Sequence, residues 1–362
     1  MRSLREGAFW LLLTLLASVA SICQTAPQMA PLPGDPAEPS TGATFVPDTP
    51  QERALVLSLV ERARQNSDLH MATMSPFTLK LSFNAAGQAL YTGAGDMEET
   101  WLSGRRWRWS AHLGGFSMLR VGGGGVAYDD KTAGPIPMRI HMLRTAVFWP
   151  VLNFSPGALI RIASTKWNGL DLMCVLLSRQ GNPATATQGR RWEEMEYCID
   201  TQAGLLRLYS EAPGIYIAYD YQDALHFHNR VLPRKITITE GETTVLSARL
   251  ESINDPVSTD AGYFTPTEQM KARGPGAMLM MPMRFPRFVS LTGGPVGHIQ
   301  PVIVVAEVGE DGKVTEAEVL QESNSALARQ VLEQVKKTTS TAGKDNGVPQ
   351  QKQFYINVQI GS

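Results

Sequence analysis

Apolar and polar residues alternate along the middle of the chain, from about residue 75 to residue 255. The run FTLKLSF at 77–83 places its apolar side chains at every second position, and RWRW at 106–109 does the same with tryptophans. Glycine-rich or acidic turns separate such runs, as at 122–125. Short runs of period two with turns between them are typical of antiparallel sheets. The pattern therefore predicts an antiparallel β-meander.

Two helical segments accompany the predicted strands. Thr49 and Glu52 have the spacing of a capping box, and Leu55 begins an apolar helical stripe after them. We expect this helix to pack against the sheet. The stretch from about 135 to 170 breaks the period-two pattern, which predicts a helical insertion or a long crossover there.

A small unit ends the chain. PVIVVAEV at 301–308 predicts a strand, the tight turn at 310–313 a hairpin, and VTEAEVLQ the returning strand. An apolar stripe predicts a helix from about Ala326 to Lys337, and QFYINVQI predicts a last strand. Together these elements predict a β-β-α-β unit.

The first residues predict export from the cytoplasm. Arg2 and Arg5 precede an apolar run over 8–22, which is shorter than the roughly 20 residues of a membrane-spanning helix. Such a run fits a secretory signal peptide, and small residues at 18–20 offer a cleavage site. An uncleaved anchor is the alternative, and lipid attachment at Cys23 is a third possibility, disfavoured by the isoleucine before it.

These features divide the chain into five parts. The first is a signal peptide or anchor, the second a proline-rich tether, the third the β-rich domain, the fourth a Pro/Gly/Met-rich linker and the fifth the terminal unit. Their bounds are 1–22, 23–49, 50–255, 256–297 and 298–362.

Composition and motifs point away from nucleic acids and from catalysis. The net charge of −1 predicts no nucleic-acid partner, which would need a basic stripe. The chain contains no nucleophile elbow, phosphate-binding loop or His-Glu-x-x-His zinc motif. His226 and His228 share one strand face, but zinc requires three or four ligands. We expect no metal, no cofactor and no enzymatic activity; an enzyme that uses these histidines with a nearby aspartate is the alternative.

Cys174 and Cys198 each lie in a predicted strand, with a loop rich in glycine, proline and threonine between them. In an oxidising compartment two such strands can be bridged, so we expect a disulfide. Two buried free thiols are the alternative, and Cys23 would remain unpaired.

Aromatic and aliphatic side chains gather on one face of the predicted meander. If the sheet curls without closing, this face becomes an apolar cavity suited to acyl chains. The same side chains would equally fill a core beneath a covering helix, and the sequence does not separate the two cases. The candidate ligand-binding residues are Phe77, Leu79, Leu81, Phe83, Trp101, Trp107 and Trp109.

The β-rich region, about 50–255, resembles the LolA/LolB-type lipoprotein carriers of bacterial envelopes. The resemblance is carried by the leading helix, the FTLKLSF strand, the ETWLSGRRWRWS segment and the meander through CIDTQAGLLRLY. It implies an α+β fold, with an antiparallel unclosed half-barrel, a covering helix and a lipid or lipoprotein acyl chain as ligand.

Residues from about 295 to 362 resemble the TonB carboxyl-terminal domain. The match is carried by the DGKV hairpin, the serine-rich helix start, the helix and the closing FYINVQI strand. The family's tyrosine-proline before the first strand is missing, and Lys337 is followed by Thr-Thr-Ser-Thr where the family has an aromatic, basic and proline segment. The resemblance implies docking to an envelope or outer-membrane protein by addition of a strand at an exposed edge, here 352–359. The candidate partner-binding residues are Phe354, Tyr355, Ile356 and Val358.

The sequence thus predicts a periplasmic, non-enzymatic protein that holds an apolar or lipid-like ligand and contacts a partner through its terminal domain. A TonB-type energy transducer, anchored by an uncleaved amino terminus, is the main alternative.

Overall fold

The computed structural model describes residues 44–47, 49–131, 134–152, 154, 157–167, 169–178, 190–192, 194–290, 299–322, 324–340, 344–345 and 347–361. The predicted signal peptide and nearly all of the predicted tether lie outside these residues. Within them, no helix is both long enough and apolar enough to cross a membrane.

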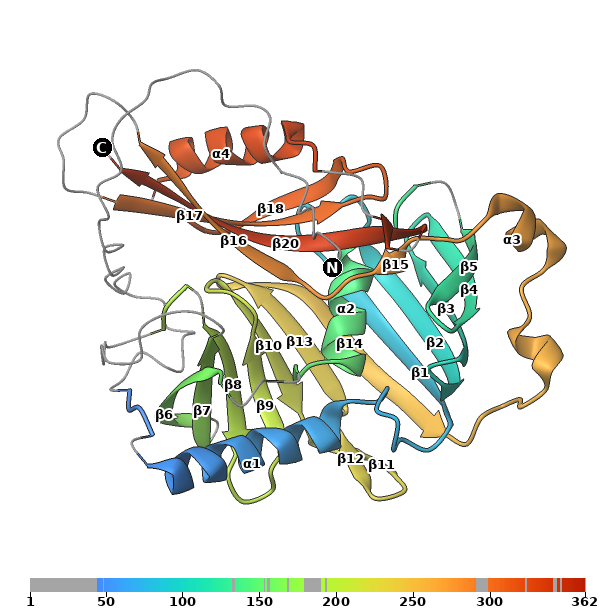
Figure 1. The fold of residues 1–362 in the computed structure, drawn as a ribbon, viewed down its shortest axis with the longest axis horizontal. Helices are drawn as coiled ribbons and strands as arrows, with labels where there is room; N and C mark the ends of the chain where they lie inside the picture. The colour runs from blue at the N-terminus through green and yellow to red at the C-terminus, as the bar shows by residue number, and fades with distance from the viewer. Residues whose placement is uncertain are drawn as a thin grey trace, which may run out of the picture.

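One large antiparallel sheet dominates the fold (Figure 1). Within the described residues it has twelve strands in the order β5-β4-β3-β2-β1-β14-β13-β10-β9-β8-β7-β6. Most neighbours in the sheet are also neighbours in sequence, as expected for a meander. The bounds are β1 Phe77–Ala85, β2 Gly93–Ser103, β3 Arg106–Leu113, β4 Phe116–Gly123, β5 Val126–Lys131, β6 Leu159–Trp167, β7 Leu170–Ser178, β8 Met195–Asp200, β9 Leu206–Ser210, β10 Ile215–Asp220, β13 Lys235–Glu240 and β14 Thr243–Asn254.

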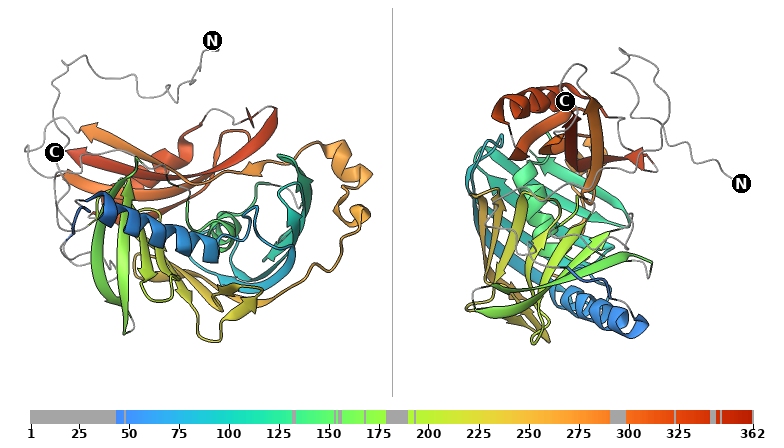
Figure 2. Two further views of the ribbon diagram at one scale, coloured as in Figure 1. Left: turned by 60° about the horizontal axis from the view of Figure 1, so that its bottom comes forward. Right: turned by 90° about the vertical axis from the view of Figure 1, so that its left-hand side faces the viewer.

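The sheet curves into a trough without closing, and its two edge strands, β5 and β6, follow each other in sequence. The connection between them must therefore cross the open side of the trough. It contains helix α2, Met138–Phe148, around which the sheet bends (Figure 2). The α+β class and the unclosed antiparallel sheet expected from the sequence are confirmed.

Helix α1, Pro50–Ser67, lies across one end of the trough. Thr49 and Glu52 form the predicted capping box, and Pro50 occupies the first turn. The buried stripe is Val56, Leu59, Val60 and Ala63, whereas Leu55 is 69% exposed. The predicted stripe was therefore wrong by one position at its start.

The segment that the sequence assigned to a linker is structured over much of its length. It contains a short 3₁₀ helix η1, Ala261–Phe264, helix α3, Glu268–Arg273, and strands β15, Met278–Leu279, and β16, Met283–Ser290. Thr267 caps α3 by accepting a hydrogen bond from the Met270 N–H. A further hairpin, β11 Leu225–Phe227 and β12 Arg230–Leu232, projects beside α1.

The terminal domain consists of β17 Ile299–Val308, β18 Val314–Glu322, α4 Ser325–Lys337, β19 Lys344–Asp345 and β20 Val348–Gly361. Asn324 caps α4 by accepting hydrogen bonds from two backbone N–H groups. One face of its sheet packs on α4, through residues such as Val302, Val304 and Val331. This arrangement follows the element order expected from the sequence.

The other face of the terminal sheet belongs to the core of the large sheet. Ile303, Val305, Leu320 and Tyr355 are buried in the same apolar cluster as the inner wall of the trough. Figure 1 shows the terminal sheet lying across the trough above α2. The two predicted domains therefore share one core.

Candidate functional site: the helix-filled trough

The inner wall of the trough holds all seven residues that the sequence singled out for an apolar cavity. Six of them are at most 5% exposed, and Trp107 is half-buried against the same cluster. They face packed side chains in this structure, because α2 fills the space in front of them. Ligand binding by these residues stays a prediction.

Helix α2 is the occupant of the trough. Every residue from Met138 to Phe148 is buried. Its carboxyl-terminal end is held by Tyr219 of β10, whose hydroxyl donates a hydrogen bond to the Ala146 carbonyl at 3.0 Å. The cavity left beside this end has about 10 Å³ of free volume, which is room for one water molecule. An acyl chain does not fit in this cavity.

Three of the eleven buried α2 residues are basic, and each has an acidic partner. Arg144 points at β2, where its Nη1 donates to Oε2 of Glu99 at 2.6 Å. His70, from the α1–β1 connection, reaches the other oxygen of Glu99 through Nε2 at 2.7 Å. A carboxylate only accepts, so the ring nitrogen donates.

Glu99 is 1% exposed, and burial alone would raise its pKa. The charges and hydrogen bonds of Arg144 and His70 outweigh burial and lower that pKa below the ordinary value. Glu99 is therefore a carboxylate held charged inside an apolar wall.

Aromatic rings surround this buried ion pair. The Arg144 guanidinium carbon lies 4.0 Å from the ring centroid of Trp109 and 4.7 Å from that of Phe148. The His70 ring stacks on Phe148 at 4.5 Å and on Trp101 at 5.6 Å. Such geometry adds cation–π attraction to the ion pair.

At the other end of α2, Arg139 joins the two domains. It contacts Glu240 of β13 and Glu318 of β18, and the Arg139 side chain is fully buried. Burial and the neighbouring Glu240 raise the pKa of Glu318 to about 8. One cation thus lies between two carboxyl groups, of which Glu318 holds its proton near neutral pH.

The terminal domain also supplies the cap of α2. Pro137 offers no side-chain acceptor at the helix start. Instead Glu316 of β18 accepts the Met138 N–H at 2.8 Å and the Leu90 N–H at 3.0 Å. A carboxylate at this position also interacts favourably with the helix dipole.

His141 completes the set of contacts between α2 and the terminal domain. Its Nδ1 lies 2.8 Å from Glu307 of β17, and its Nε2 lies 2.9 Å from the Met280 carbonyl. Gln351 of β20 donates to both Glu307 and the Ile136 carbonyl. The terminal domain therefore covers α2 and fixes its amino-terminal end.

Sequence reasoning missed this polar set. Glu316 and Glu318 flank Ala317 in the predicted returning strand, and no role was predicted for either acid. The available signal was on α2, where Arg139, His141 and Arg144 interrupt an otherwise apolar segment. Basic residues in a buried helix require acids from neighbouring elements.

The predicted partner-binding edge is already paired in this structure. Strand β17 pairs antiparallel with β20 on one side, and β16 pairs parallel with it from Phe354 to Gly361 on the other. The expectation of an exposed edge at 352–359 is therefore wrong for this conformation, because the linker itself provides a strand. Partner binding by Phe354, Tyr355, Ile356 and Val358 stays a prediction.

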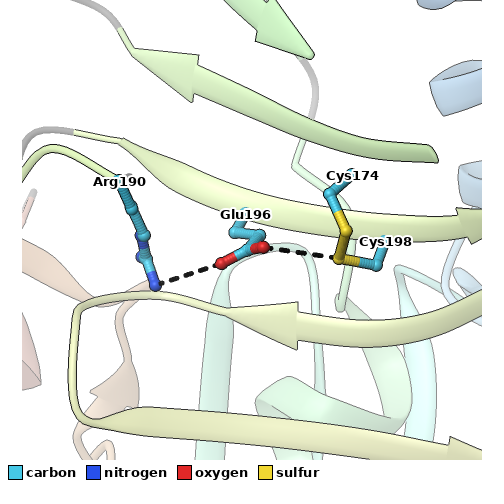
Figure 3. Close-up of a disulfide and its surroundings, with 4 residues drawn as sticks. All are labelled: Cys174, Arg190, Glu196 and Cys198. Carbon is cyan, nitrogen blue, oxygen red and sulfur yellow. Dashed lines mark hydrogen bonds and ion pairs between the residues drawn. A yellow bond between two sulfur atoms is a disulfide. The ribbon is translucent and has the colours of Figure 1, made fainter. Parts of the chain in front are cut away.

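The predicted disulfide is present. Cys174 of β7 and Cys198 of β8 are directly opposite in the strand register and are bonded to each other (Figure 3). Both lie in a small apolar cluster apart from the main core, with Ala163, Leu172 and Leu208. Glu196 lies beside them, with its Oε1 3.4 Å from the Cys198 sulfur and its Oε2 3.9 Å from Arg190.

His226 and His228 are exposed on the β11–β12 hairpin. His228 lies 3.5 Å from Asp255. Among the described residues these histidines join no group of three potential metal ligands; the one such group is Cys174, Glu196 and Cys198, whose sulfurs are bonded to each other. The absence of catalytic activity stays a prediction.

A family model matches the terminal domain of the chain. A family model described as the Gram-negative bacterial TonB protein C-terminal matches residues 301–359. No curated protein matches the chain.

Among solved structures, a putative outer membrane lipoprotein-sorting protein domain from Vibrio parahaemolyticus has 7% identity and a TM-score of 0.36, covering 59% of this chain and 95% of its own. A LolA superfamily protein from Nitrosomonas europaea has 9% identity and a TM-score of 0.37, covering 58% and 97%. A DUF1329 family protein from Desulfovibrio piger has 10% identity and a TM-score of 0.35, covering 59% and 95%.

All three TM-scores are below 0.5. The TonB-type match is typical of a protein of the Gram-negative envelope. The chain joins an unclosed half-barrel, whose solved neighbours include a LolA superfamily protein, to a terminal domain that matches the TonB carboxyl-terminal family.

Proposed function

We propose that this is a non-enzymatic periplasmic protein that binds an apolar, lipid-like ligand in the trough, in the space that α2 occupies. The observation that carries the proposal is the position of α2. It lies against an apolar wall, and it contributes no strand pairing to the large sheet. Its departure would therefore leave the sheet intact and uncover a wall of aromatic and aliphatic side chains.

The way in which α2 is held supports an exchangeable occupant. Both of its ends are attached to loops, and its polar contacts are made at separate positions by Arg139, His141 and Arg144. A helix that only filled a core would be expected to bury apolar side chains there, since buried ion pairs add little net stability compared with apolar packing. Discrete polar contacts instead define one seated position, and a ligand that displaced α2 would have to compensate the acids left behind.

The test is uptake of a fluorescent fatty acid, cis-parinaric acid, together with native mass spectrometry of protein purified from its own envelope. We expect saturable uptake and a co-purified lipid. The E316A variant removes the acceptor at the start of α2, a loss of about 1 kcal/mol, and should speed uptake about fivefold. E333A on the exposed side of α4 is the matched control and should not. If no lipid co-purifies, and neither the unmodified protein nor E316A takes up the fatty acid, the carrier function is excluded.

We further infer that a partner in the envelope binds the terminal domain by adding a strand to β20 in place of β16. Support comes from the parallel pairing of β16, which covers the edge with a segment of the linker rather than with the domain's own sheet. Pro286 in that segment lacks a backbone N–H, which is typical of an edge strand.

A further inference from the structure

The strongest unexplained feature of the trough is a single buried carboxylate in its apolar wall. Glu99 lies on the inward face of β2, between Leu79 of β1 and Trp109 of β3 in the strand register. An isolated charge in such surroundings is costly, so it must be compensated. Its strongest compensating charge, Arg144, comes from α2 and not from the wall.

The contacts of Arg144 show which kind of chemical group this part of the wall binds. Its guanidinium donates to Glu99 at 2.6 Å, lies over the Trp109 ring at 4.0 Å and has Nη1 3.9 Å from the Met97 sulfur. A carboxylate beside an indole face is the usual chemistry of a site for organic cations. The chain's own side chain is therefore a stand-in for a cationic ligand group.

Once Arg144 moves away, the site keeps the Glu99 carboxylate and loses the arginine that pairs with it. Beyond Trp109, the next residue across the sheet is Arg120 of β4, which lies opposite Asp129 of β5. The Arg120 Nε is 4.0 Å from the Asp129 Oδ2, and the Arg120 guanidinium also donates to the Ala277 carbonyl. Arg120 and Asp129 balance each other, so Arg120 does not compensate Glu99 once Arg144 has left. His70 keeps its hydrogen bond to Glu99, since it comes from the α1–β1 connection.

We propose that Glu99 and Trp109 form a site for the cationic head group of an amphiphilic ligand, a site that Arg144 occupies in this structure. The inference rests on the proposed function and specifies its ligand: an apolar chain along Phe77, Leu79 and Leu81, with an ammonium group at Glu99. Arg144 then competes with the ligand head group, so that α2 and the ligand occupy the trough alternately.

The test compares three amphiphiles with the same tail: dodecyltrimethylammonium, dodecyl maltoside and dodecyl sulfate, each below its micelle concentration. We expect the cationic probe to displace a neutral reporter, the methyl ester of cis-parinaric acid, about tenfold more tightly than the neutral probe does, and the anionic probe to be weakest. In the E99Q/R144M variant, which removes both charges and avoids an unpaired one, this preference should disappear while the neutral probe still binds. E98Q alters the neighbouring acid, which pairs with Lys80, and should behave as the unmodified protein.

A second measurement keeps the inference testable without movement of α2. R144A leaves the Glu99 site open, so tetramethylammonium or methylguanidinium should raise the melting temperature of R144A and leave that of E99Q/R144M unchanged.

Equal binding of the three amphiphiles, or preference for the sulfate, would overturn the head-group site while leaving the lipid-binding function in place. Absence of binding by all three, with no effect of small cations on R144A, would overturn both.

Discussion

Individual charged residues decide how α2 is seated. Arg139, His141 and Arg144 are buried at 0%, 2% and 5% exposure, and each lies against an acid from another element. Breaking one buried pair by removing a single partner is costly, because the remaining charge has no counterion. Replacing both partners together costs far less stability. The residue-scale predictions follow from this asymmetry.

R144M should lower the free energy of unfolding by about 3 kcal/mol, because it leaves Glu99 charged in an apolar wall. The double variant E99Q/R144M should recover most of that loss. Urea denaturation measures both. R249M, at a half-exposed site on β14, provides the control and should change little. A double variant no more stable than R144M would contradict the ion-pair account.

Glu318 should make the protein less stable as the pH rises. Its pKa is raised from 4.5 to about 8, so between these values the folded protein holds a proton that the unfolded chain has lost. The free energy of unfolding therefore falls across this window, and the contribution is lost as the pH passes through about 8. E318Q cannot titrate and should flatten the decline, whereas E333Q should not. Urea denaturation at a series of pH values from about 5 to about 9 measures the slope of the unfolding free energy against pH. Equal slopes in E318Q and the unmodified protein would refute this role.

At the scale of elements, the repeating patterns were predictable and the pairings between distant segments were not. Period-two runs gave the strands of the meander, and the Thr49 capping box gave the start of α1. Strand β16 was missed, because it lies in a Pro-rich segment without a period-two pattern. Helix α2 lies within the predicted helical insertion, but its placement inside the trough depends on acids far away in sequence and leaves no local pattern.

The candidate site was likewise only half predictable. The aromatic wall followed from alternation, because side chains of one parity share one face of a strand. Its filling by α2, and the role of Glu99 within it, could not be inferred, since the sequence pattern gives a face but not the element that covers it.

Strand β16 should protect the edge of β20 from pairing with strands of other molecules. Replacing residues 283–290 by a Gly/Ser segment of equal length keeps the connection but removes the pairing with β20. We expect faster amide exchange in 354–361 and concentration-dependent self-association, measured by hydrogen-exchange mass spectrometry and light scattering, because an unpaired edge recruits other strands. The same replacement at 257–260, outside any strand, should do neither. A monomer with unchanged exchange would show that β16 does not cover the edge.

The disulfide should stabilise the β7–β8 hairpin. Its cysteines are 24 residues apart, and a closed loop of this size contributes about 3 kcal/mol. The C174S/C198S variant should therefore unfold at lower urea concentration. Alkylation of the unfolded, unreduced protein should leave both cysteines unmodified before reduction; their alkylation at that stage would contradict the pairing.

As a whole molecule, the protein consists of a half-barrel and a terminal domain that share one apolar core and hold a helix between them. Glu316 and Glu307 of the terminal domain contact α2 directly, so the position of that domain and the filling of the trough are coupled. A partner that moves the terminal domain would thereby loosen α2. Under the proposed function, coupling of this kind would release the ligand where the partner binds.

The most direct test of the account is amide hydrogen exchange in α2 with and without cis-parinaric acid. Saturating ligand should speed exchange of residues 138–148 while β1 and β14 stay protected, because the fatty acid takes the place of the helix. Saturable binding that leaves the protection of α2 unchanged or higher would contradict exchange of the helix for the ligand.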